Sequence, residues 1–462
     1  MRGITERNKE FYRKVFVIAL PIVIQNLITS SLNIVDTIMI GSLGEREIAA
    51  VGIGNQYFFL LNILMMGIFS GIGVFISQYF GKNDHKSIKK LVGIGIIISF
   101  IVGGIFTIIA MIFPYEIIGI FNGDKEVIEI GASYLIIVCF SYVFTALSFN
   151  FGIASRCIEK TTVPMIASGI ALLINTLLNY CLIFGAGGMP ELGVRGAAIA
   201  TLIARIVEFI ILIGYIYITK SILLGKVKEY LDFNVEFLRK ILITVMPVLL
   251  NEACWGLGSV MYNIIYGRIG TSAIASVQIA TTISNLFMVV IFGIASASLV
   301  MVGKEVGCGN EEKGILYGKN SLKLGCIIGA IISLLIILLS SNIVEFYNVS
   351  QEVKIWTQAI LYVTSLVMII RVYNIIAIVG VLRGGGDTKV SFYIEASTMW
   401  LIGVPVALIG AFILQVPVYI VYALCGLEEL VKMFFCVKRI KSKKWIVNLV
   451  TDEFNQEKLV EI

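Results

Sequence analysis

The sequence predicts an all-α polytopic membrane protein with twelve transmembrane helices. We expect two six-helix lobes related by a pseudo-two-fold axis along the membrane normal. Hydrophobic residues make up 58% of the 462 positions and charged residues only 14%, whereas a soluble globular chain has about 45–50% and about 25%. Long apolar runs recur along the chain, and its two halves resemble each other at a fixed offset. Lipid is therefore the expected solvent for most of the chain.

Apolar runs along the chain are long enough to cross about 30 Å of hydrocarbon at 1.5 Å per residue of helix. The first run carries Pro21 and is too long for a cleaved signal peptide, so we expect a retained helix. The predicted spans are 15–40, 50–80, 91–113, 132–155, 162–185, 194–218, 241–266, 273–303, 317–341, 355–382, 389–413 and 416–436. The even number places both termini on one side of the membrane.

The distribution of lysine and arginine indicates which side that is, because cytoplasmic loops carry the excess of these residues. With both termini in the cytoplasm, 29 of the 36 basic residues lie inside and 5 lie in outside loops. The other two, Arg205 and Arg371, fall within spans. The basic surplus is thus a topology signal, and no nucleic-acid partner is expected. We expect a multi-pass protein of the cell inner (plasma) membrane.

An internal repeat accounts for the even number of spans. Pairs matched at an offset of 226 residues are Pro21 and Pro247, Gly41 and Gly267, Gly44 and Gly270, Gly67 and Gly293, and Gly81 and Gly307. Parallel repeats are typical of secondary transporters, with the substrate site between the lobes. The predicted organisation is a cytoplasmic tail 1–14, an N-terminal lobe 15–218, a cytoplasmic linker 219–240, a C-terminal lobe 241–436 and a cytoplasmic tail 437–462.

Several kinds of enzyme chemistry lack the residues they need. The sequence has no GxxxxGK[ST] phosphate loop, His85 is the only histidine, and none of the 8 cysteines falls in a CxxC pair. The glycine-rich stretch 383–389 lies between two predicted spans, where we interpret it as a tight interhelical turn rather than a phosphate cradle. We expect no enzyme activity and no cofactor, with energy supplied by an ion gradient or a partner.

Polar residues inside the spans are the candidate functional residues, since a carboxylate at the centre of a transmembrane helix costs roughly 2.5–3.5 kcal/mol. Asp36 lies near the outer end of the first span, Asn175 and Asn179 share one face of the fifth, and Thr201 lies in the sixth. All four fall in the outer half of the N-terminal lobe, a set that suits binding of a proton or Na⁺. The alternatives are that Asp36 reaches the nearby interface and that the asparagines only join helices.

The C-terminal lobe has its own candidates. Glu252, five residues after Pro247 in the seventh span, is either a functional acid or a structural acid paired with a polar neighbour. Pro21 and Pro247 remove a helical hydrogen bond at matching points of the two lobes and are candidate bending points. Pairing with an arginine of the spans is the expected role of the remaining acids in or near the membrane, Glu208, Glu395, Glu428 and Glu429.

A series of short motifs follows in a distinctive order. They are Ala19-Leu20-Pro21, Val35-Asp36, Gly41-Ser42-Leu43-Gly44, Gly193-Val194-Arg195-Gly196-Ala197-Ala198, Met246-Pro247, Asn251-Glu252, and Leu382-Arg383-Gly384-Gly385-Gly386-Asp387-Thr388-Lys389. In this order and spacing, over about residues 10–440, the chain resembles exporters of the MATE (multidrug and toxic compound extrusion) family, bacterial type. The resemblance implies a twelve-helix antiporter that exports amphipathic, often cationic compounds in exchange for H⁺ or Na⁺.

The resemblance also implies residue roles. The coupling ion would bind the helix 1 acid, Asp36, assisted by polar residues of helices 4, 5 and 6, namely Asn150, Asn175, Asn179 and Thr201. The helix 7 acid corresponds to Glu252 and the bending proline to Pro21. The region matching helix 10 reads Arg371-Val372-Tyr373-Asn374 and holds no acid, which argues against a second-lobe Na⁺ site built on that pair. Na⁺ at Asp36 is therefore the one metal ion left open.

We expect alternating access between the lobes, with small amphipathic or cationic substrates and the lipid bilayer as partners, and a monomer. One alternative is a flippase for lipids or lipid-linked oligosaccharides, of a related family with the same duplicated layout. Such a protein should line its cavity with several basic residues, and only Arg205 and Arg371 are available within the spans. The other alternative is a membrane scaffold or enzyme subunit that transports nothing.

Overall fold

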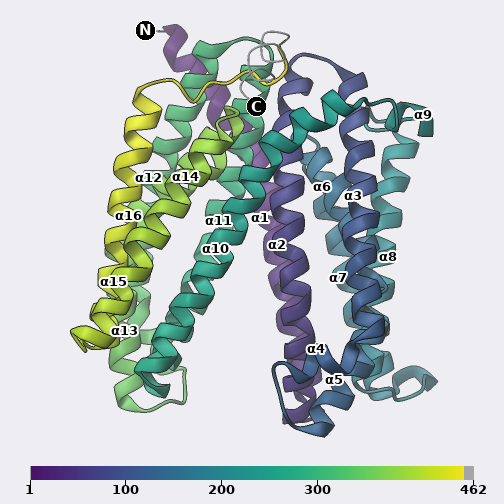
Figure 1. Cartoon of the computed structure of the whole chain (residues 1–462), viewed down its shortest axis with the longest axis vertical. Helices are drawn as coiled ribbons and strands as arrows, with labels where there is room; N and C mark the ends of the chain where they lie inside the picture. Colours follow the sequence, from purple (N-terminus) through teal and green to yellow (C-terminus); the bar gives the residue numbers. More distant parts are fainter. Residues whose placement is uncertain (1, 452–462) are drawn as a thin grey trace. The chain divides into compact units, whose positions relative to one another are not determined.

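The computed structural model describes residues 2–451, and Met1 and 452–462 of the predicted tails lie outside the described residues. Figure 1 shows long, roughly parallel helices joined by short connections. The elements are α1 (Arg2–Gly41), α2 (Glu45–Gly81), α3 (His85–Ile112), α4 (Pro114–Gly119), α5 (Lys125–Val138), α6 (Ser141–Cys157), α7 (Thr162–Phe184), a 3₁₀ turn η1 (Ala186–Gly188), α8 (Val194–Ile218), α9 (Val227–Tyr230), α10 (Val235–Ile269), α11 (Thr271–Gly307), α12 (Glu311–Glu345), α13 (Gln351–Ile375), π-helical η2 (Ile376–Leu382), α14 (Thr388–Thr398), π-helical η3 (Met399–Gly403), α15 (Val404–Leu408), π-helical η4 (Ile409–Ile413) and α16 (Val418–Lys441).

The predicted all-α membrane fold is confirmed, with two differences in the spans. In the described part of the chain, 10 helices are long and apolar enough to cross a membrane, and α5 with α6 form an eleventh candidate. The predicted span 132–155 is wrong as one continuous helix, because α5 and α6 meet at a bend of 50°. The predicted last span corresponds to α16, a 24-residue helix that is not among those ten, because Glu428, Glu429 and Lys432 interrupt its apolar sequence.

The repeat read from the sequence recurs in the helix boundaries. Helices α2, α3, α5 and α7 begin at Glu45, His85, Lys125 and Thr162, and α11, α12, α13 and α14 begin 226 residues later at Thr271, Glu311, Gln351 and Thr388. The turns before α2 and α11 also match, because Gly44 and Gly270 adopt φ of 154° and 156°. A side chain is strained at such φ values, which explains glycine at both positions.

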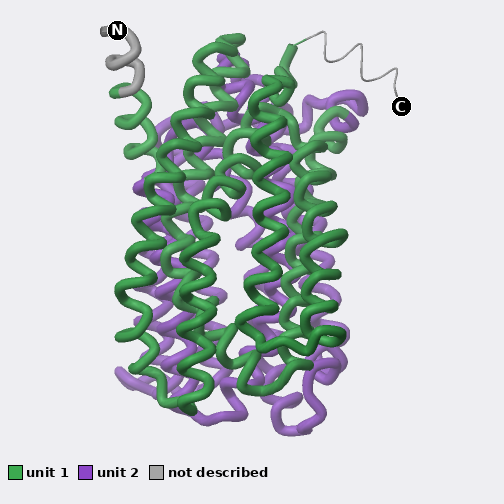
Figure 2. Tube along the Cα trace, turned by 90° about the vertical axis from the view of Figure 1, so that its left-hand side faces the viewer, with its two compact units in different colours: residues 1–19, 240–462 green, residues 20–239 purple. Residues whose placement is uncertain are grey.

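The chain forms two compact units, coloured separately in Figure 2. Unit 1 comprises 1–19 and 240–462, and unit 2 comprises 20–239. The start of α1 therefore packs with the second half of the sequence, and the start of α10 packs with the first half. In unit 1 the rings of Phe11 and Tyr317 lie 5.4 Å apart, and in unit 2 those of Phe237 and Tyr79 lie 6.3 Å apart. Phe11 and Phe237 are equivalent positions of the repeat, so the exchange is reciprocal.

Part of the predicted C-terminal tail 437–462 is folded against unit 1. Trp445 is 1% exposed and lies against Gly385, in the glycine-rich turn that precedes α14. The backbone N–H of Val447 donates to Gly385 O at 2.7 Å, and Arg439 Nε donates to Asp387 Oδ2 at 2.6 Å. The stretch 383–389 is thus an interhelical turn, as predicted, closed by the segment that follows α16.

Candidate functional site

Four predicted residues meet at one end of unit 2. Asn179 on α7 donates through Nδ2 to Asp36 Oδ1 on α1 at 2.5 Å and to Asn175 Oδ1 at 3.1 Å. Asn175 donates through its own Nδ2 to Thr201 Oγ1 on α8 at 3.4 Å. Asn175 and Asn179 are 1% and 0% exposed, so this face of α7 lies inside the bundle. Three helices thus bring one acid, two amides and a hydroxyl into a single chain of contacts.

This cluster holds an unused hydrogen-bond acceptor. Asn179 Oδ1 is buried and accepts no hydrogen bond from any described residue, while its Nδ2 faces Asp36 and Asn175. A buried polar atom left without a partner costs about 1–3 kcal/mol. The space beside Asp36 therefore favours a species that brings a donor or a positive charge, such as a proton on the carboxyl group or a Na⁺ ion shared with the amide oxygen.

Two more side chains act on Asp36 although the sequence did not assign them to this cluster. Tyr134 on α5 is 5% exposed and lies close enough to interact electrostatically with Asp36. Arg205, one turn after Thr201 on α8, also interacts electrostatically with Asp36, but no ion pair joins them in the described part of the chain. Arg205 could have been found from its position four residues after Thr201, whereas no pattern in the sequence singled out Tyr134.

Asn150 lies apart from this cluster. It is on α6, 2% exposed, and its Nδ2 donates to the backbone carbonyl of Val92 on α3 at 3.1 Å. Its side chain also packs against Gly95, where an added Cβ would lie 2.1 Å from Asn150 Oδ1. Asn150 thus joins α6 to α3, and its contacts among the described residues do not include Asp36.

A second series of hydrogen-bonded polar side chains lies in the other half of the same unit. Arg156 Nη2 donates to Gln25 Oε1 at 2.6 Å, and Gln25 Nε2 donates to Ser168 Oγ at 3.0 Å. Ser168 Oγ donates to Glu208 Oε1 at 2.6 Å, and Arg205 Nη1 donates to Glu208 Oε2 at 2.8 Å. The predicted pairing of Glu208 with a membrane arginine is therefore present. Arg205 is the residue common to this chain and the surroundings of Asp36.

In unit 1, Glu252 is paired with a basic residue. Arg383 Nη1 lies 2.7 Å from Glu252 Oε1, and Arg383 Nη2 donates to Asn251 Oδ1 at 2.5 Å. Asn251 also donates through Nδ2 to the carbonyl of Ser391 on α14 at 3.4 Å. Arg383 is 2% exposed although the sequence placed it in a cytoplasmic loop. Of the two interpretations of Glu252, this geometry favours the structural one, an acid that ties α10 to the turn before α14.

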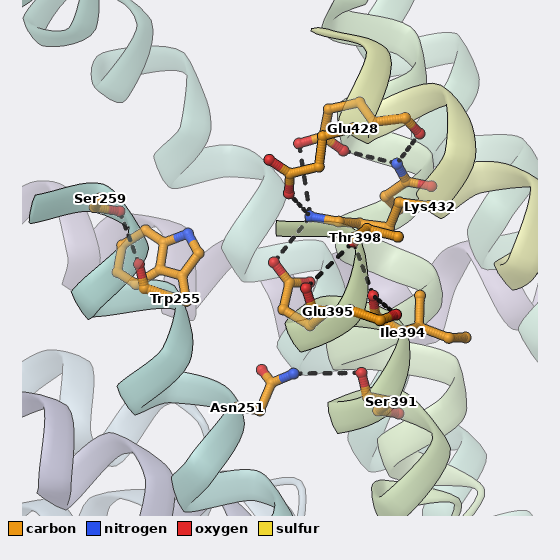
Figure 3. Close-up of polar contacts among 12 residues, drawn as sticks. Asn251, Trp255, Ser259, Ser391, Ile394, Glu395, Thr398, Glu428 and Lys432 are labelled. Atoms are coloured by element: carbon orange, nitrogen blue, oxygen red, sulfur yellow. Dashed lines mark hydrogen bonds and ion pairs between the residues drawn. The ribbon is translucent and has the colours of Figure 1, made fainter. Parts of the chain in front are cut away.

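Unit 1 also contains a buried charge cluster around Lys432 of α16 (Figure 3). Lys432 Nζ lies 2.9 Å from Glu395 Oε1 on α14 and 2.8 Å from Glu428 Oε1. It is 4% exposed and lies within the predicted span 416–436. Glu428 also accepts a hydrogen bond from the Tyr262 hydroxyl at 2.6 Å. The i,i+4 spacing of Glu428 and Lys432 on an otherwise apolar helix was the available sequence signal for this pair.

The internal repeat that contains these sites also identifies a protein family. A sequence profile of the MatE family matches residues 21–181 and 247–409, two segments whose starts are separated by the offset of the internal repeat. The matched segments cover more than half of the chain. This chain belongs to the MATE family. The family recognised from the motifs is thus confirmed, and the protein is a polytopic membrane transporter.

Curated MATE relatives cover most of the chain. One is the probable multidrug resistance protein NorM of Thermotoga maritima, 25% identical over 87% of this chain and 86% of the relative. Another is the probable multidrug resistance protein NorM of Pasteurella multocida, 27% identical over 85% of both chains. The relatives therefore match this transporter across both repeats.

Solved MATE structures share the fold. The Vibrio cholerae MATE transporter VcmN in its bent form gives a TM-score of 0.86 at 18% identity, with 96% of this chain and 100% of that chain covered. An outward-facing multidrug resistance MATE transporter gives a TM-score of 0.84 at 20% identity, with 93% of this chain and 96% of that chain covered. This likeness confirms the predicted fold class.

Proposed function

We propose that this MATE transporter exports amphipathic, often cationic compounds from the cell in exchange for H⁺ or Na⁺, through a multi-pass bundle in the inner (plasma) membrane with both termini in the cytoplasm. The names of the curated relatives support multidrug efflux as the transport activity. The coupling ion binds at Asp36, and the surrounding amides and hydroxyl stabilise the bound form. No cofactor and no second protein take part in the proposed cycle.

The observation that carries the proposal is the environment of Asp36. Its carboxylate receives one hydrogen bond from Asn179, whose own Oδ1 lies buried without a donor. A bound proton or Na⁺ supplies the missing positive charge or donor at this point. Among the described residues, Asp36 is the only acid in the series of contacts that includes Asn175 and Thr201. Whether Asp36 binds a proton or Na⁺ therefore decides the net charge of this cluster.

The charges of unit 2 suggest how the ion and a cationic substrate exclude each other. The two polar chains contain Asp36 and Glu208 as acids and Arg156 and Arg205 as bases. With Asp36 ionised the four charges balance, whereas a bound proton or Na⁺ leaves one positive charge. That excess disfavours a cationic substrate in a medium of low dielectric constant. Release of the ion toward the cytoplasm restores the balance and allows the next substrate to bind.

The membrane potential drives this exchange when the ion moves inward. Moving one charge across 100 mV supplies about 2.3 kcal/mol, which corresponds to roughly a fifty-fold gradient of a neutral substrate because each 1.4 kcal/mol is a factor of ten. Export of a monovalent cation against one H⁺ moves no net charge, so the pH gradient alone drives it. Substrate charge and ion stoichiometry are therefore measurable from the response to each gradient.

The test is transport by the purified protein in liposomes. Ethidium movement is followed under a pH gradient and, separately, under a Na⁺ gradient, with wild type and Asp36→Asn compared. The matched control is Asp124→Asn, an exposed acid at the start of α5 in the same unit whose capping role an asparagine also fulfils. We expect transport under at least one gradient in wild type and in Asp124→Asn, and its loss in Asp36→Asn.

Each outcome has a defined meaning. The gradient that supports transport identifies the coupling ion. A folded Asp36→Asn protein that still couples ethidium movement to the gradient would disprove the role of Asp36. If wild type moves ethidium under neither gradient, fluorescent lipids and lipid-linked oligosaccharides become the next substrates to test, because the flippase alternative predicts their movement.

A further inference from the structure

We propose that Glu208 is a positioning residue that holds the Arg205 guanidinium away from Asp36 and thereby sets how tightly Asp36 binds its cation. The inference rests on the proposed ion-binding role of Asp36. It gives Glu208, which the proposed transport cycle counts only as one of four charges, a specific effect on Asp36.

The register of α8 places Arg205 between the two acids. Thr201, Arg205 and Glu208 are spaced i, i+4 and i+7, so they lie on one face of the helix. Thr201 contacts the Asp36 cluster through Asn175. Glu208 contacts the second polar chain one turn further along. Arg205 is therefore about one helical turn from Thr201 and from Glu208. Its long side chain is able to approach either Asp36 or Glu208.

Glu208 is held rigidly in place. Its Oε1 accepts a hydrogen bond from Ser168 Oγ at 2.6 Å, and its Oε2 accepts from Arg205 Nη1 at 2.8 Å. Ser168 is oriented in turn by Gln25, which is oriented by Arg156. The Glu208 side chain is 9% exposed and that of Arg205 21%. A carboxylate fixed in this way is a preorganised partner, and a charged hydrogen bond of this length is among the stronger ones in proteins.

Asp36 competes for the same guanidinium. Arg205 interacts electrostatically with Asp36, yet its ion pair is with Glu208. Among the described residues, the Tyr134 hydroxyl from α5 and the Asn179 amide from α7 also act on Asp36, and neither carries a positive charge. Arg205 is thus the side chain whose approach would neutralise Asp36 without an ion. A cation and Arg205 are alternative partners of one carboxylate.

On the other side, Glu208 faces Arg156 from α6 as well as Arg205 from α8. Arg156 interacts with Glu208 electrostatically but contacts it only through Gln25 and Ser168. Loss of the Glu208 charge removes the acid that both arginines share, and Asp36 is then the acid that still interacts with Arg205. Arg205, which already interacts with Asp36, is then free to turn toward it. We therefore expect the cation affinity of Asp36 to fall when Glu208 is neutralised, provided that Arg205 is present.

The experiment is a pH titration of Asp36 in the full-length protein reconstituted in phosphatidylcholine vesicles. Infrared difference spectra report the carbonyl band of protonated carboxyl groups, and the part of the band missing in Asp36→Asn is assigned to Asp36. Glu208→Gln should move the midpoint of this titration to lower pH by about one to three units, the usual effect of an arginine next to an aspartate. Arg205→Gln should move it to higher pH.

The double variant distinguishes repositioning from direct repulsion between the acids. In the Arg205→Gln background, Glu208→Gln should cause no further downward shift. A downward shift of equal size with and without Arg205 would overturn the proposal, because it would mean that Glu208 acts on Asp36 by its charge alone. An unchanged midpoint in Glu208→Gln would overturn it as well, since the ion pair would then only hold helices together.

Two further variants serve as controls. Glu126→Gln breaks another arginine–glutamate pair of the same unit, Arg46–Glu126, and should leave the midpoint unchanged. Ser168→Ala keeps every charge but removes one of the two contacts that fix Glu208, so it should shift the midpoint downward by less than Glu208→Gln does. It also replaces Glu208→Gln as the test if that variant does not fold. An unshifted Ser168→Ala would then count against the proposal.

The titration requires no transport, so it separates the two proposals. A downward shift in a protein that moves no substrate under any gradient would support the role of Glu208 and reject the transport function. Gradient-driven transport with an unshifted Asp36 would do the reverse. In an active protein, the pH of half-maximal ethidium efflux should follow the spectroscopic midpoint across all variants.

Discussion

Replacing Lys432 by methionine tests whether the buried charge cluster of unit 1 stabilises the fold. The variant keeps the volume of the side chain and removes the ammonium group that lies 2.9 Å from Glu395 and 2.8 Å from Glu428. Glu429, at 4.0 Å, has a second partner, because Asn374 Nδ2 donates to its Oε2 at 2.7 Å. Glu395 and Glu428 are therefore the two acids within 3 Å of the ammonium group, and Glu428 keeps the Tyr262 hydroxyl as a donor when that group is removed.

The size of the effect follows from what those two acids can do without the lysine. Breaking a buried ion pair by removing one partner costs about 3–5 kcal/mol. A carboxylate can escape this cost by taking up a proton, which for an ordinary glutamate of pKa about 4.3 costs about 3.7 kcal/mol at pH 7 and about 1 kcal/mol at pH 5. We therefore expect Lys432→Met to lower the free energy of unfolding by about 4 kcal/mol at pH 7 and by much less at pH 5.

Thermal unfolding in detergent measures this loss. An unfolding entropy of about 2.1 cal/mol/K per residue gives about 1 kcal/mol/K for the 462 residues. Each 1 kcal/mol then shifts Tm by about 1 °C, so Lys432→Met should unfold about 4 °C below wild type at pH 7 and closer to it at pH 5. Glu395→Gln added to Lys432→Met should recover part of the loss, since it removes one of the orphaned charges. The control is Lys438→Met, an exposed lysine of the same helix.

Two results would refute this reasoning. A Lys432→Met protein as stable at pH 7 as Lys438→Met would show that the buried pairs make no net contribution. A deficit that stays the same at pH 5, or that Glu395→Gln does not relieve, would point to packing around the lysine stem rather than to uncompensated charge.

Three more perturbations follow from the described contacts. Gly95→Ala should destabilise the protein by about 1–3 kcal/mol and lower its Tm, because the new Cβ would meet Asn150 Oδ1 at 2.1 Å; an unchanged Tm would mean that α3 and α6 can separate at no cost. Trp445→Ala should cost about 3–5 kcal/mol and make the turn before α14 sensitive to protease, whereas a resistant turn would show that it closes without the indole. The pKa of Glu229 lies below its usual value because Lys89 donates a hydrogen bond to it at 2.9 Å. This contact contributes above the ordinary glutamate pKa and is lost as pH falls, so amide exchange around α9 should rise below about pH 4 beyond its intrinsic change, and not in Glu229→Gln.

Much of the fold was predictable because the membrane and the repeat both constrain it. The lengths of the apolar runs predicted the helices. The offset between Gly44 and Gly270 predicted two equivalent halves, and the helix starts of these halves recur in the structure. The bend between α5 and α6 was not predictable, because apolar residues continue through 139–140 and no proline or glycine marks the break. The reciprocal exchange of helix starts depends on tertiary packing that hydropathy does not report.

The candidate site was predictable for those residues that depth in the membrane and position on a helical face are sufficient to bring together. Asp36, Asn175, Asn179 and Thr201 share a depth, and the structure brings them into one chain of contacts. Family resemblance added Asn150, whose side chain contacts α3 instead. A single side chain's partner depends on the direction in which it points around its helix, and that direction follows from packing rather than from spacing.

The same limit explains Lys432. Counting basic residues assumes that a lysine near a helix end lies in water. Lys432 departs from it because two carboxylates from different helices lie within 3 Å and compensate for its burial. Sequence shows only one of the two, Glu428, while Glu395 lies 37 positions away.

The reciprocal exchange makes the two halves of the gene product interdependent. A fragment ending at 239 would carry Phe11 of α1 without its ring partner Tyr317, and a fragment beginning at 240 would lack both that helix start and Phe237. Neither repeat is therefore a complete folding unit, although each carries six predicted spans. The boundary inside α1 falls between Ala19 and Leu20, directly before Pro21, where the helical ladder lacks a hydrogen bond. One continuous helix thus enters both units, so a bend at this proline would be transmitted to the second half through the backbone itself, without any change at a side-chain interface.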